Sequence, residues 1–587
     1  MRSAKLTNTD KLMRGAHPAS RPTGGDDPEE TTMRHKQFLT NAGLASVLTG
    51  LLMAAAQAQS PAALTGQVSS AEEGPMEGVL VSAKKDGSNI TVTVVSDQKG
   101  EYSFPGGRLD PGHYTVSIRA ADYDLDGPKT VDVSASGSKA DIKLVKTKNL
   151  ANQLANAEWL MSAPGPDTLK ANMTNCVGCH TLQRVFASTH DSDEFKQVFQ
   201  RMGTYSPGST PMHPQPLLPG PRADRSPMPK AQFDAMSNWL ASVNLSKTDH
   251  HDYELATLAR PKGEATRVII TQYDLPRPQA QPHDVIVDQD GMVWYSDFGN
   301  QFVGVMDPKT GQVTDIPIPV LKPQEPKGGL DLELDAGQKN VWLAMMYQAG
   351  LAEIDRHTHA VKTYPFPKDW QSPSTQASMV SPQHDDVDGK VWTNNQEAHA
   401  MYRLDLKTGQ YEDLGPSKDP AGRQISAYGM PTDQQNNVYQ LEFGGTSIGL
   451  RDAKTGMTTI YRTPISGSRP RRGRVDDQNR LWFAEYGGNA IGLFDPKTAA
   501  IKEYPLPTKW DDPYDVVASR DAAEVWTGSM MTDRVARLDT KTGKITEYLL
   551  PRSTNIRRVS LQETGPRPVL WAGSNHGASI VKVEPLD

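Results

Sequence analysis

The chain has 587 residues and a formal net charge of −7, and it contains 48 glycines and 44 prolines. This length predicts several domains, because a single domain usually spans about 100–200 residues. The acidic balance argues against nucleic-acid binding, which requires a basic excess. The abundance of glycine and proline is typical of a turn-rich protein. We therefore expect a mainly β, multidomain chain.

Residues 1–58 are predicted to be a disordered start followed by a secretory signal peptide. A charged stretch, Arg34-His35-Lys36, precedes an apolar run from Leu44 to Met53, and Ala56-Gln57-Ala58 has the small-x-small form of a cleavage site. Translation from Met33, rather than from the first methionine, would put this signal at the extreme N-terminus. Cleavage after Ala58 predicts a periplasmic or secreted protein with no transmembrane segment after signal removal. The alternative is a retained membrane anchor.

Residues 61–146 are predicted to form a small β-sandwich. Apolar and polar residues alternate in segments such as 79–83, 90–95 and 114–118, and glycine, aspartate and proline separate them. The pattern S-D-x-x-G-x-Y-x-F, followed by L-x-P-G-x-Y-x-V, resembles the carboxypeptidase regulatory-like domains. That resemblance implies a transthyretin-like sandwich without catalytic activity.

The only two cysteines of the chain stand in the run Cys176-Val177-Gly178-Cys179-His180. The spacing C-x-x-C-H is the attachment pattern of a c-type haem. Two thiols a turn apart form thioethers with the porphyrin, and the adjacent histidine becomes an axial ligand of the iron. A disulfide redox pair does not need the histidine, and a zinc site would need further ligands. The motif therefore predicts one covalent haem c held by Cys176, Cys179 and His180.

Residues 150–246 surround this motif with expected helices at 150–161, 193–202 and 230–243. The second of them has apolar residues at Phe195, Val198, Phe199 and Met202, which is the spacing of an amphipathic helix. Helix, C-x-x-C-H, helix, loop and terminal helix together resemble a small all-α cytochrome c domain.

The second axial ligand of the iron is expected to be a methionine, the common partner of histidine in such centres. Met228 precedes Pro229 just before the terminal helix, as in the Met-Pro pair of many cytochromes. Met202 ends the preceding helix in an Arg-Met pair, as in a second group of cytochromes. Met228 and Met202 remain equal candidates, and Met212 is a third.

From residue 266 to residue 587 the chain repeats itself every 43 to 50 residues. The marker of each repeat is an aromatic residue in a short strand: Trp294, Trp342, Trp392, Tyr439, Trp482, Trp526 and Trp571. Six of them are followed by an aspartate-led turn such as Asp307-Pro308-Lys309-Thr310-Gly311. About four strands per repeat predict a seven-bladed β-propeller. The extra strand at 268–276 is expected to complete the last blade and close the ring.

The run Leu481-Trp482-Phe483-Ala484-Glu485 and the repeated D-P-K-T-G turns resemble the virginiamycin B lyase family of seven-bladed propellers. The resemblance implies a loop histidine as base and a divalent metal held by glutamates, and Glu485 matches one metal-ligand position. The loop that should supply the base reads Ser468-Arg469-Pro470-Arg471-Arg472-Gly473-Arg474. Arginine does not act as a base near neutral pH and repels a divalent cation, which argues against elimination chemistry in this chain.

Residues at the blade entrances are expected to point into the central channel: His283, His384, Tyr428, Arg474, Tyr514, Arg558, Asp297, Asn394, Glu442 and Glu485. His283, His384, Arg474 and Glu485 are the catalytic candidates among them. An arginine cluster suits an anionic ligand, with Arg474 and Arg558 as expected contacts. We expect an exported multidomain cytochrome whose haem exchanges electrons with a redox protein or a small-molecule donor. The alternative is a virginiamycin B lyase-like carbon–oxygen lyase with an accessory cytochrome domain.

Overall fold

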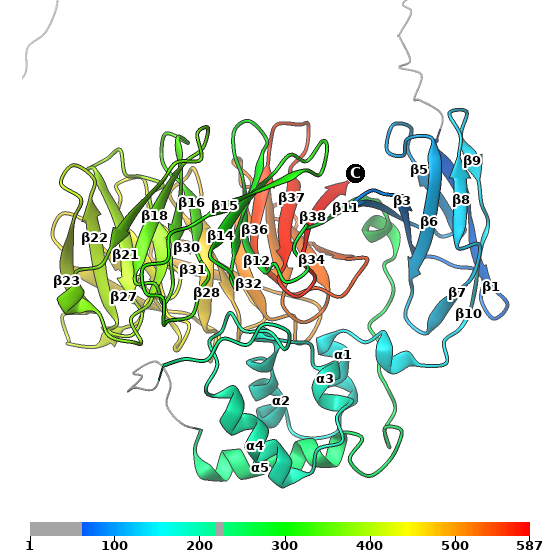
Figure 1. Cartoon of the computed structure of the whole chain (residues 1–587), viewed down its shortest axis with the longest axis horizontal. Coiled ribbons are helices and arrows are strands. Elements are labelled where there is room, and N and C mark those ends of the chain that lie inside the picture. Colours follow the sequence, from blue (N-terminus) through cyan, green and yellow to red (C-terminus); the bar gives the residue numbers. More distant parts are fainter. Residues whose placement is uncertain (1–61, 219–227, 587) are drawn as a thin grey trace, which may run out of the picture. The chain divides into compact units, whose positions relative to one another are not determined.

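The computed structural model describes residues 62–218 and 228–586 (Figure 1). The predicted disordered start, the signal peptide and the cleavage site after Ala58 lie outside these ranges. Residues 59–587 make up one unit of the chain. None of the described helices is both long enough and apolar enough to cross a membrane.

The first part of the described chain is a β-sandwich. One sheet holds β1 (Leu64–Ser70), β2 (Gly74–Pro75), β5 (Glu101–Phe104), β7 (Tyr123–Gly127), β9 (Ser138–Lys139) and β10 (Ile142–Lys146). The other contains β3 (Leu80–Lys85), β4 (Ile90–Val95), β6 (Gly112–Arg119) and β8 (Thr130–Val133). Their alternating residues, among them Val68, Val81 and Phe104, meet in one buried apolar cluster. The sandwich expected at 61–146 is therefore present.

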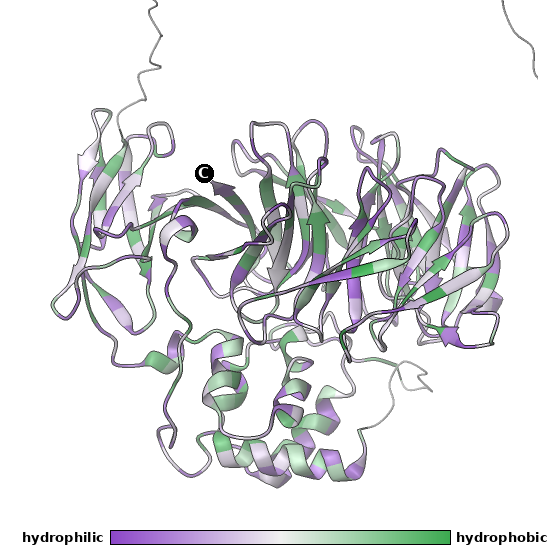
Figure 2. Cartoon of the chain, turned by 180° about the vertical axis from the view of Figure 1, so that it is seen from behind, coloured by the Kyte–Doolittle hydropathy of each residue, from purple (hydrophilic) through white to green (hydrophobic). Residues whose placement is uncertain are grey.

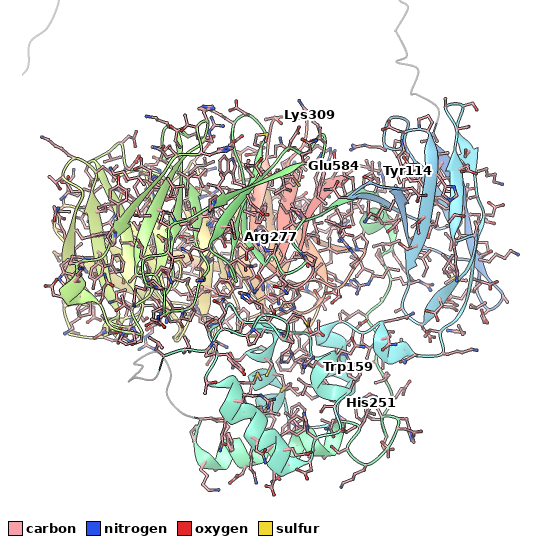
Figure 3. All side chains as sticks on the ribbon, viewed as in Figure 1. Tyr114, Trp159, His251, Arg277, Lys309 and Glu584 are labelled. Carbon is pink, nitrogen blue, oxygen red and sulfur yellow. The ribbon has the colours of Figure 1, made fainter. Side chains whose placement is uncertain are left out.

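The described residues that follow contain five α-helices: α1 (Asn156–Ser162), α2 (Asp167–Met173), α3 (Gln183–Phe186), α4 (Ser192–Met202) and α5 (Lys230–Val243). Helix α4 begins at a capping box, in which Asp191 and Glu194 each accept a hydrogen bond from the backbone N–H of the other. Trp159 stacks on Phe186 with ring centroids 5.1 Å apart, and its ring lies 5.0 Å from that of His251 (Figure 3). These rings lie in and beside the core on which the helices pack.

The single helix predicted at 150–161 is wrong. The chain instead forms a 3-10 turn at Leu150–Asn152 and starts α1 four residues later, at Asn156. The carboxylate of Glu158 accepts a hydrogen bond from the backbone N–H of Ala155, and Ala155 itself is extended. Gln153 hydrogen-bonds to Asp122 and Tyr123 of the sandwich. Tertiary contacts at Gln153 thus interrupt a segment whose apolar spacing alone favours one helix.

Seven sheets follow around a ring, which confirms the predicted β-propeller. Blade one contains β12 (Pro282–Val287), β13 (Val293–Asp297), β14 (Phe302–Met306) and β15 (Val313–Pro317). Blade two contains β16 (Leu332–Leu334), β17 (Asn340–Ala344), β18 (Gly350–Asp355) and β19 (Val361–Pro365). Blade three contains β20 (Ala377–Ser381), β21 (Lys390–Asn395), β22 (Ala400–Asp405), β23 (Gln410–Lys418) and β24 (Gln424–Ile425). Blade four contains β25 (Val438–Leu441), β26 (Ser447–Arg451) and β27 (Thr458–Arg462). Blade five contains β28 (Pro470–Val475), β29 (Leu481–Glu485), β30 (Ala490–Asp495) and β31 (Ala500–Pro505). Blade six contains β32 (Pro513–Ala518), β33 (Glu524–Ser529), β34 (Arg534–Asp539) and β35 (Ile545–Leu549). The seven marker aromatics are all buried, and Figure 2 shows hydrophobic residues along the propeller strands.

The seventh blade contains β36 (Ile556–Gln562), β37 (Val569–Ser574), β38 (Ser579–Pro585) and, as its outer strand, β11 (Val268–Asp274). β11 pairs with β38 along its whole length, from Val268 opposite Pro585 to Asp274 opposite Ser579. This pairing confirms the predicted closing strand. The other edge of β11 pairs with β4 of the sandwich, so that one sheet of eight strands runs from the closing blade into the sandwich.

Candidate functional site

The innermost strand of several blades carries a β-bulge at the same place. The register shifts between Pro282 and Val285 in β12, between Pro470 and Gly473 in β28, between Pro513 and Val516 in β32, and between Ile556 and Val559 in β36. A bulge breaks the alternation of a strand and re-aims a side chain. The two residues inside each bulge define two rings of side chains. The helix-side ring is His283, Arg471, Tyr514 and Arg557; the channel ring is Asp284, Arg472, Asp515 and Arg558.

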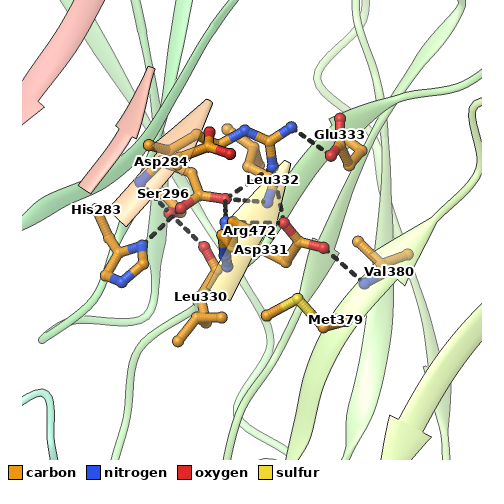
Figure 4. Close-up of polar contacts among 12 residues, drawn as sticks. His283, Asp284, Ser296, Leu330, Asp331, Leu332, Glu333, Met379, Val380 and Arg472 are labelled. Carbon is orange, nitrogen blue, oxygen red and sulfur yellow. Dashed lines mark hydrogen bonds and ion pairs between the residues drawn. The ribbon is translucent and has the colours of Figure 1, made fainter. Parts of the chain in front are cut away.

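Arginines of the channel ring are paired with carboxylates across the propeller axis (Figure 4). Arg472 of blade five lies 2.8 Å from Asp284 of blade one and 3.2 Å from Asp331 of blade two. Arg558 of blade seven lies 3.0 Å from Asp284 and 2.8 Å from Asp331, and it also pairs with Glu333. Contacts between such distant blades show that these side chains meet at the centre of the ring.

The electrostatics of the channel ring follow from burial and these pairs. Burial raises the pKa of Asp284, but the charges of Arg472 and Arg558 outweigh it and hold that pKa well below the usual value. For Asp331 burial prevails over the same two arginines, and its pKa is raised to about 7. The arginines of the channel ring are therefore paired with carboxylates, although Nε and Nη2 of Arg472 and Nε of Arg558 have no hydrogen-bond partner among the described residues.

The helix-side ring contains a chain of hydrogen bonds that ends at Asp284. The hydroxyls of Tyr428 and Tyr514 lie 2.5 Å apart, and the Tyr514 hydroxyl lies 3.0 Å from Nε2 of His283. Nδ1 of His283 lies 2.6 Å from Asp284. Burial lowers the pKa of His283 to about 3, so its ring is neutral, with the Nδ1 proton donated to Asp284 and Nε2 accepting from Tyr514.

The two arginines of the helix-side ring have no ion pair with a carboxylate among the described residues. The Arg471 guanidinium lies 3.8 Å from the ring centroid of Tyr514 and 4.3 Å from that of Phe443, and its Nε has no hydrogen-bond partner. Arg557 donates to the backbone oxygen of Gly178 at 2.8 Å and to the side chain of Asn555 at 2.9 Å. Only 9% of Arg471 and 3% of Arg557 is exposed. This ring therefore holds two buried positive charges without a carboxylate partner.

The cysteine motif forms a single turn beside this ring. Residues Cys176–Gly178 are a 3-10 helix, and the N–H of Cys179 donates to the oxygen of Cys176 at 3.3 Å. Among the described residues, neither Cys176 nor Cys179 forms a disulfide. Nδ1 of His180 lies 2.9 Å from the carbonyl oxygen of Thr181, a contact that selects the tautomer with the proton on Nδ1 and leaves Nε2 as the available ligand atom.

Propeller residues hold this turn from the other side. Asn555 donates to the oxygen of Val177 at 3.2 Å, next to the bond from Arg557 to Gly178. The ring of His576 lies near the same two carbonyls, and burial lowers its pKa to about 3. The turn, the helical core and the propeller residues Tyr486, Tyr514, Met530 and Met531 belong to one apolar cluster. The cysteine motif is thus part of the interface between the helices and the propeller.

The donor set of the turn fits a covalently attached haem. Two unoxidised thiols flank one helical turn, and an imidazole with an oriented Nδ1 follows. Of the methionine candidates, Met202 and Met228 are each 38% exposed and Met212 is 78% exposed. The second axial ligand therefore stays a prediction shared between Met202 and Met228.

The other catalytic candidates lie apart from one another. His384 hydrogen-bonds to Thr432 at 2.8 Å, and burial lowers its pKa. Arg474 is paired with Asp515 at 3.1 Å and Arg558 with three carboxylates, so neither offers the unpaired charge that the sequence suggested. Glu485 is buried with both carboxylate oxygens unpartnered, and its pKa is raised to about 8 by burial and then by the charge of Glu503. Within residues 62–218 and 228–586, no three His, Cys, Asp or Glu side chains gather as a metal site.

Sequence reasoning missed Arg471, Arg557 and His576. It treated the arginines of the loop before β29 as one cluster and did not separate those with carboxylate partners from those without. The available signal was the repeated pair at the blade entrance, His283-Asp284, Arg471-Arg472, Tyr514-Asp515 and Arg557-Arg558, each followed by glycine or valine.

Comparisons with known proteins agree with this architecture. Residues 419–586 match the virginiamycin B lyase family and residues 63–145 match the carboxypeptidase regulatory-like domain. The chain therefore contains a carboxypeptidase regulatory-like sandwich and a virginiamycin B lyase-like propeller. No curated protein matches the sequence.

Among solved structures, the chain is similar to a streptogramin B lyase, with 18% identity, a TM-score of 0.47, and 55% of this chain and 100% of the other covered. It is also similar to the virginiamycin B lyase of Staphylococcus aureus, with 18% identity, a TM-score of 0.46, and 54% and 99% covered.

Proposed function

We propose that this chain is an exported c-type cytochrome whose propeller binds a small anionic substrate or a redox partner. The observation that carries the proposal is the Cys176-x-x-Cys179-His180 turn, in which the two cysteines form no disulfide with each other. In it, the two thiols have the spacing and the histidine has the tautomer that covalent haem attachment requires. The haem, when bound, supplies one-electron transfer. Met202 or Met228 would supply the second protein ligand of its iron.

In this proposal the residues of the chain have separate tasks. Cys176 and Cys179 anchor the group, and the carbonyl of Thr181 orients His180. Asn555 and Arg557 fasten the turn to the propeller. The helix-side ring lies directly against the attachment turn, so a ligand bound there is within short range for electron exchange. The protein works outside the cytoplasm, where such attachment occurs, and the predicted signal peptide agrees with that location.

Covalent haem attachment is tested by haem staining after denaturing electrophoresis, with the haem content measured as the pyridine haemochrome. We expect one haem per chain in the wild type and none in the double variant Cys176→Ala/Cys179→Ala, because both thioethers are removed. His190→Ala, a partly exposed histidine of the same helical segment, should retain the full haem content. A stained band in the double variant would refute the assignment.

A lyase-like elimination is the second candidate function. It is supported by the family match over 419–586 and by Glu485, whose buried, unpartnered oxygens occupy the position where the resemblance implies a metal ligand. Against it, the loop that should carry the base holds Arg469, Arg471 and Arg472. A ring-opening assay with a streptogramin B in the presence of Mg²⁺ separates this candidate from the cytochrome.

A further inference from the structure

The charge of the helix-side ring is not balanced by the residues around it. Besides the rings of Tyr514 and Phe443, Arg471 faces Tyr486 at 4.5 Å, and its Nη1 lies 3.5 Å from the sulfur of Met530. Asp512 is a carboxyl within electrostatic reach of Arg469 and Arg471, and burial raises its pKa to about 7 in spite of both arginines. Near neutral pH it is only partly ionised, so it compensates only part of the charge.

Aromatic contacts stabilise the charge of Arg471 but do not neutralise it. Its guanidinium faces four rings, and none of these contacts is an ion pair. The phenol of Tyr428 responds to the surplus: burial raises its pKa, but the charges of Arg471 and Arg472 outweigh burial and the pKa is lowered. The two arginines without a carboxylate partner among the described residues therefore mark the region as electropositive, and the lowered pKa of Tyr428 has the same cause.

The shape of the charged groups indicates what would neutralise them. A guanidinium is a planar fork that binds carboxylates with two parallel hydrogen bonds. Nε of Arg471 has no partner, and it stands among flat aromatic walls. Arg557 stands over Phe298, with 5.0 Å between its guanidinium and the ring centroid, and within 5.9 Å of the Tyr514 ring that Arg471 also contacts. Both arginines thus border the same ring, next to the hydroxyls of Tyr428 and Tyr514.

We propose that Arg471 and Arg557 bind a carboxylate of a small organic anion at the propeller end that faces the cysteine turn. This inference rests on the proposed function only in placing the site beside a haem. The carboxylate comes either from a free anion or from the propionates of the haem itself. Arg474 and Arg558, which already have carboxylate partners, are not part of the site.

Benzoate is the probe for the free anion, and benzyl alcohol, its neutral counterpart, is the ligand control. Calorimetry on the full-length haem-loaded protein should show binding of benzoate and none of benzyl alcohol. Arg471→Gln and Arg557→Gln should each weaken benzoate binding at least tenfold. Arg520→Gln removes the same charge from a side chain that is 77% exposed and should leave the affinity unchanged. Arg471→Lys keeps the positive charge but lacks the planar guanidinium, and it should bind benzoate with intermediate affinity. This variant also tests the proposal if Arg471→Gln does not fold.

The two sources of the carboxylate give different results. If a propionate occupies the site, benzoate does not bind, and the propionate bending band in the resonance Raman spectrum shifts in Arg471→Gln but not in Arg520→Gln. If benzoate does not bind and the band does not move, the proposal is overturned. If the purified protein carries no haem but still binds benzoate through Arg471, the proposed cytochrome function fails and the anion site stands.

Discussion

The two rings of the propeller are built from neighbouring residues and yet differ in charge balance. Arg472 and Arg558 of the channel ring share Asp284 and Asp331, whereas Arg471 and Arg557, each one residue earlier in the chain, have no carboxylate partner within residues 62–218 and 228–586. The same bulge supplies both rings, so backbone geometry does not explain the difference. The difference lies in what faces each ring: acidic residues of blades one and two on one side, and the cysteine turn on the other. The paired arginines of the channel ring stabilise the fold, whereas Arg471 and Arg557 of the helix-side ring are available to bind an anion.

The largest expected effect is on the channel ring. Asp284→Asn should lower the free energy of unfolding by about 3–5 kcal/mol, because it leaves two buried arginines short of a partner. Urea denaturation of the full chain measures this loss. Arg471→Gln removes an unpaired charge and should cost less than about 1 kcal/mol in the absence of ligand. If Asp284→Asn and Arg471→Gln lowered the free energy of unfolding equally, the two rings would not differ in their contribution to stability.

A pH-dependent effect is expected from a buried acid that lacks a cation. Because the pKa of Glu485 is raised from 4.5 to about 8 in the folded state, its contribution to stability is fully present below pH 4.5 and is lost as the pH rises towards 8. Glu485→Gln should remove this pH dependence and make the variant more stable than the wild type at pH 8. Thermal unfolding at pH 5 and at pH 8 gives the comparison. A wild type that gains stability over this interval relative to the variant would contradict it.

The smallest effect is expected from an ion pair that faces solvent. Arg108 of the sandwich makes two hydrogen bonds to Glu584 of β38, and its side chain is 37% exposed. Arg108→Ala should cost about 0.2–1 kcal/mol, because water and salt screen such pairs. Denaturation at low and at high salt should show the loss only at low salt. A loss as large as that of Asp284→Asn would mean that pairing, rather than burial, governs the energetics.

The blade number and the closing strand could be predicted because the buried aromatics recur at nearly constant spacing and 268–276 is a strand without a repeat of its own. The helix-side ring and the channel ring could not be predicted from the sequence. Strict alternation would send His283 and Asp284 to opposite faces of β12, whereas the bulge turns both into the interior. The helix break at Gln153 depends on contacts with the sandwich, 30 residues earlier in the chain, that no local pattern contains. Pairing between blades five, seven and one likewise depends on closure of the ring.

The eight-stranded sheet has a consequence for the order of folding during synthesis. β11 leaves the ribosome long before β38, the strand that it pairs with in the closing blade. Until then its hydrogen-bonding edges would be open to other chains. β4 belongs to a sandwich that is already complete by that time, and it pairs with β11 from Tyr273 opposite Ile90 to Ile270 opposite Thr93. The sandwich thus pairs with one edge of β11 while the remaining blades of the propeller are synthesised.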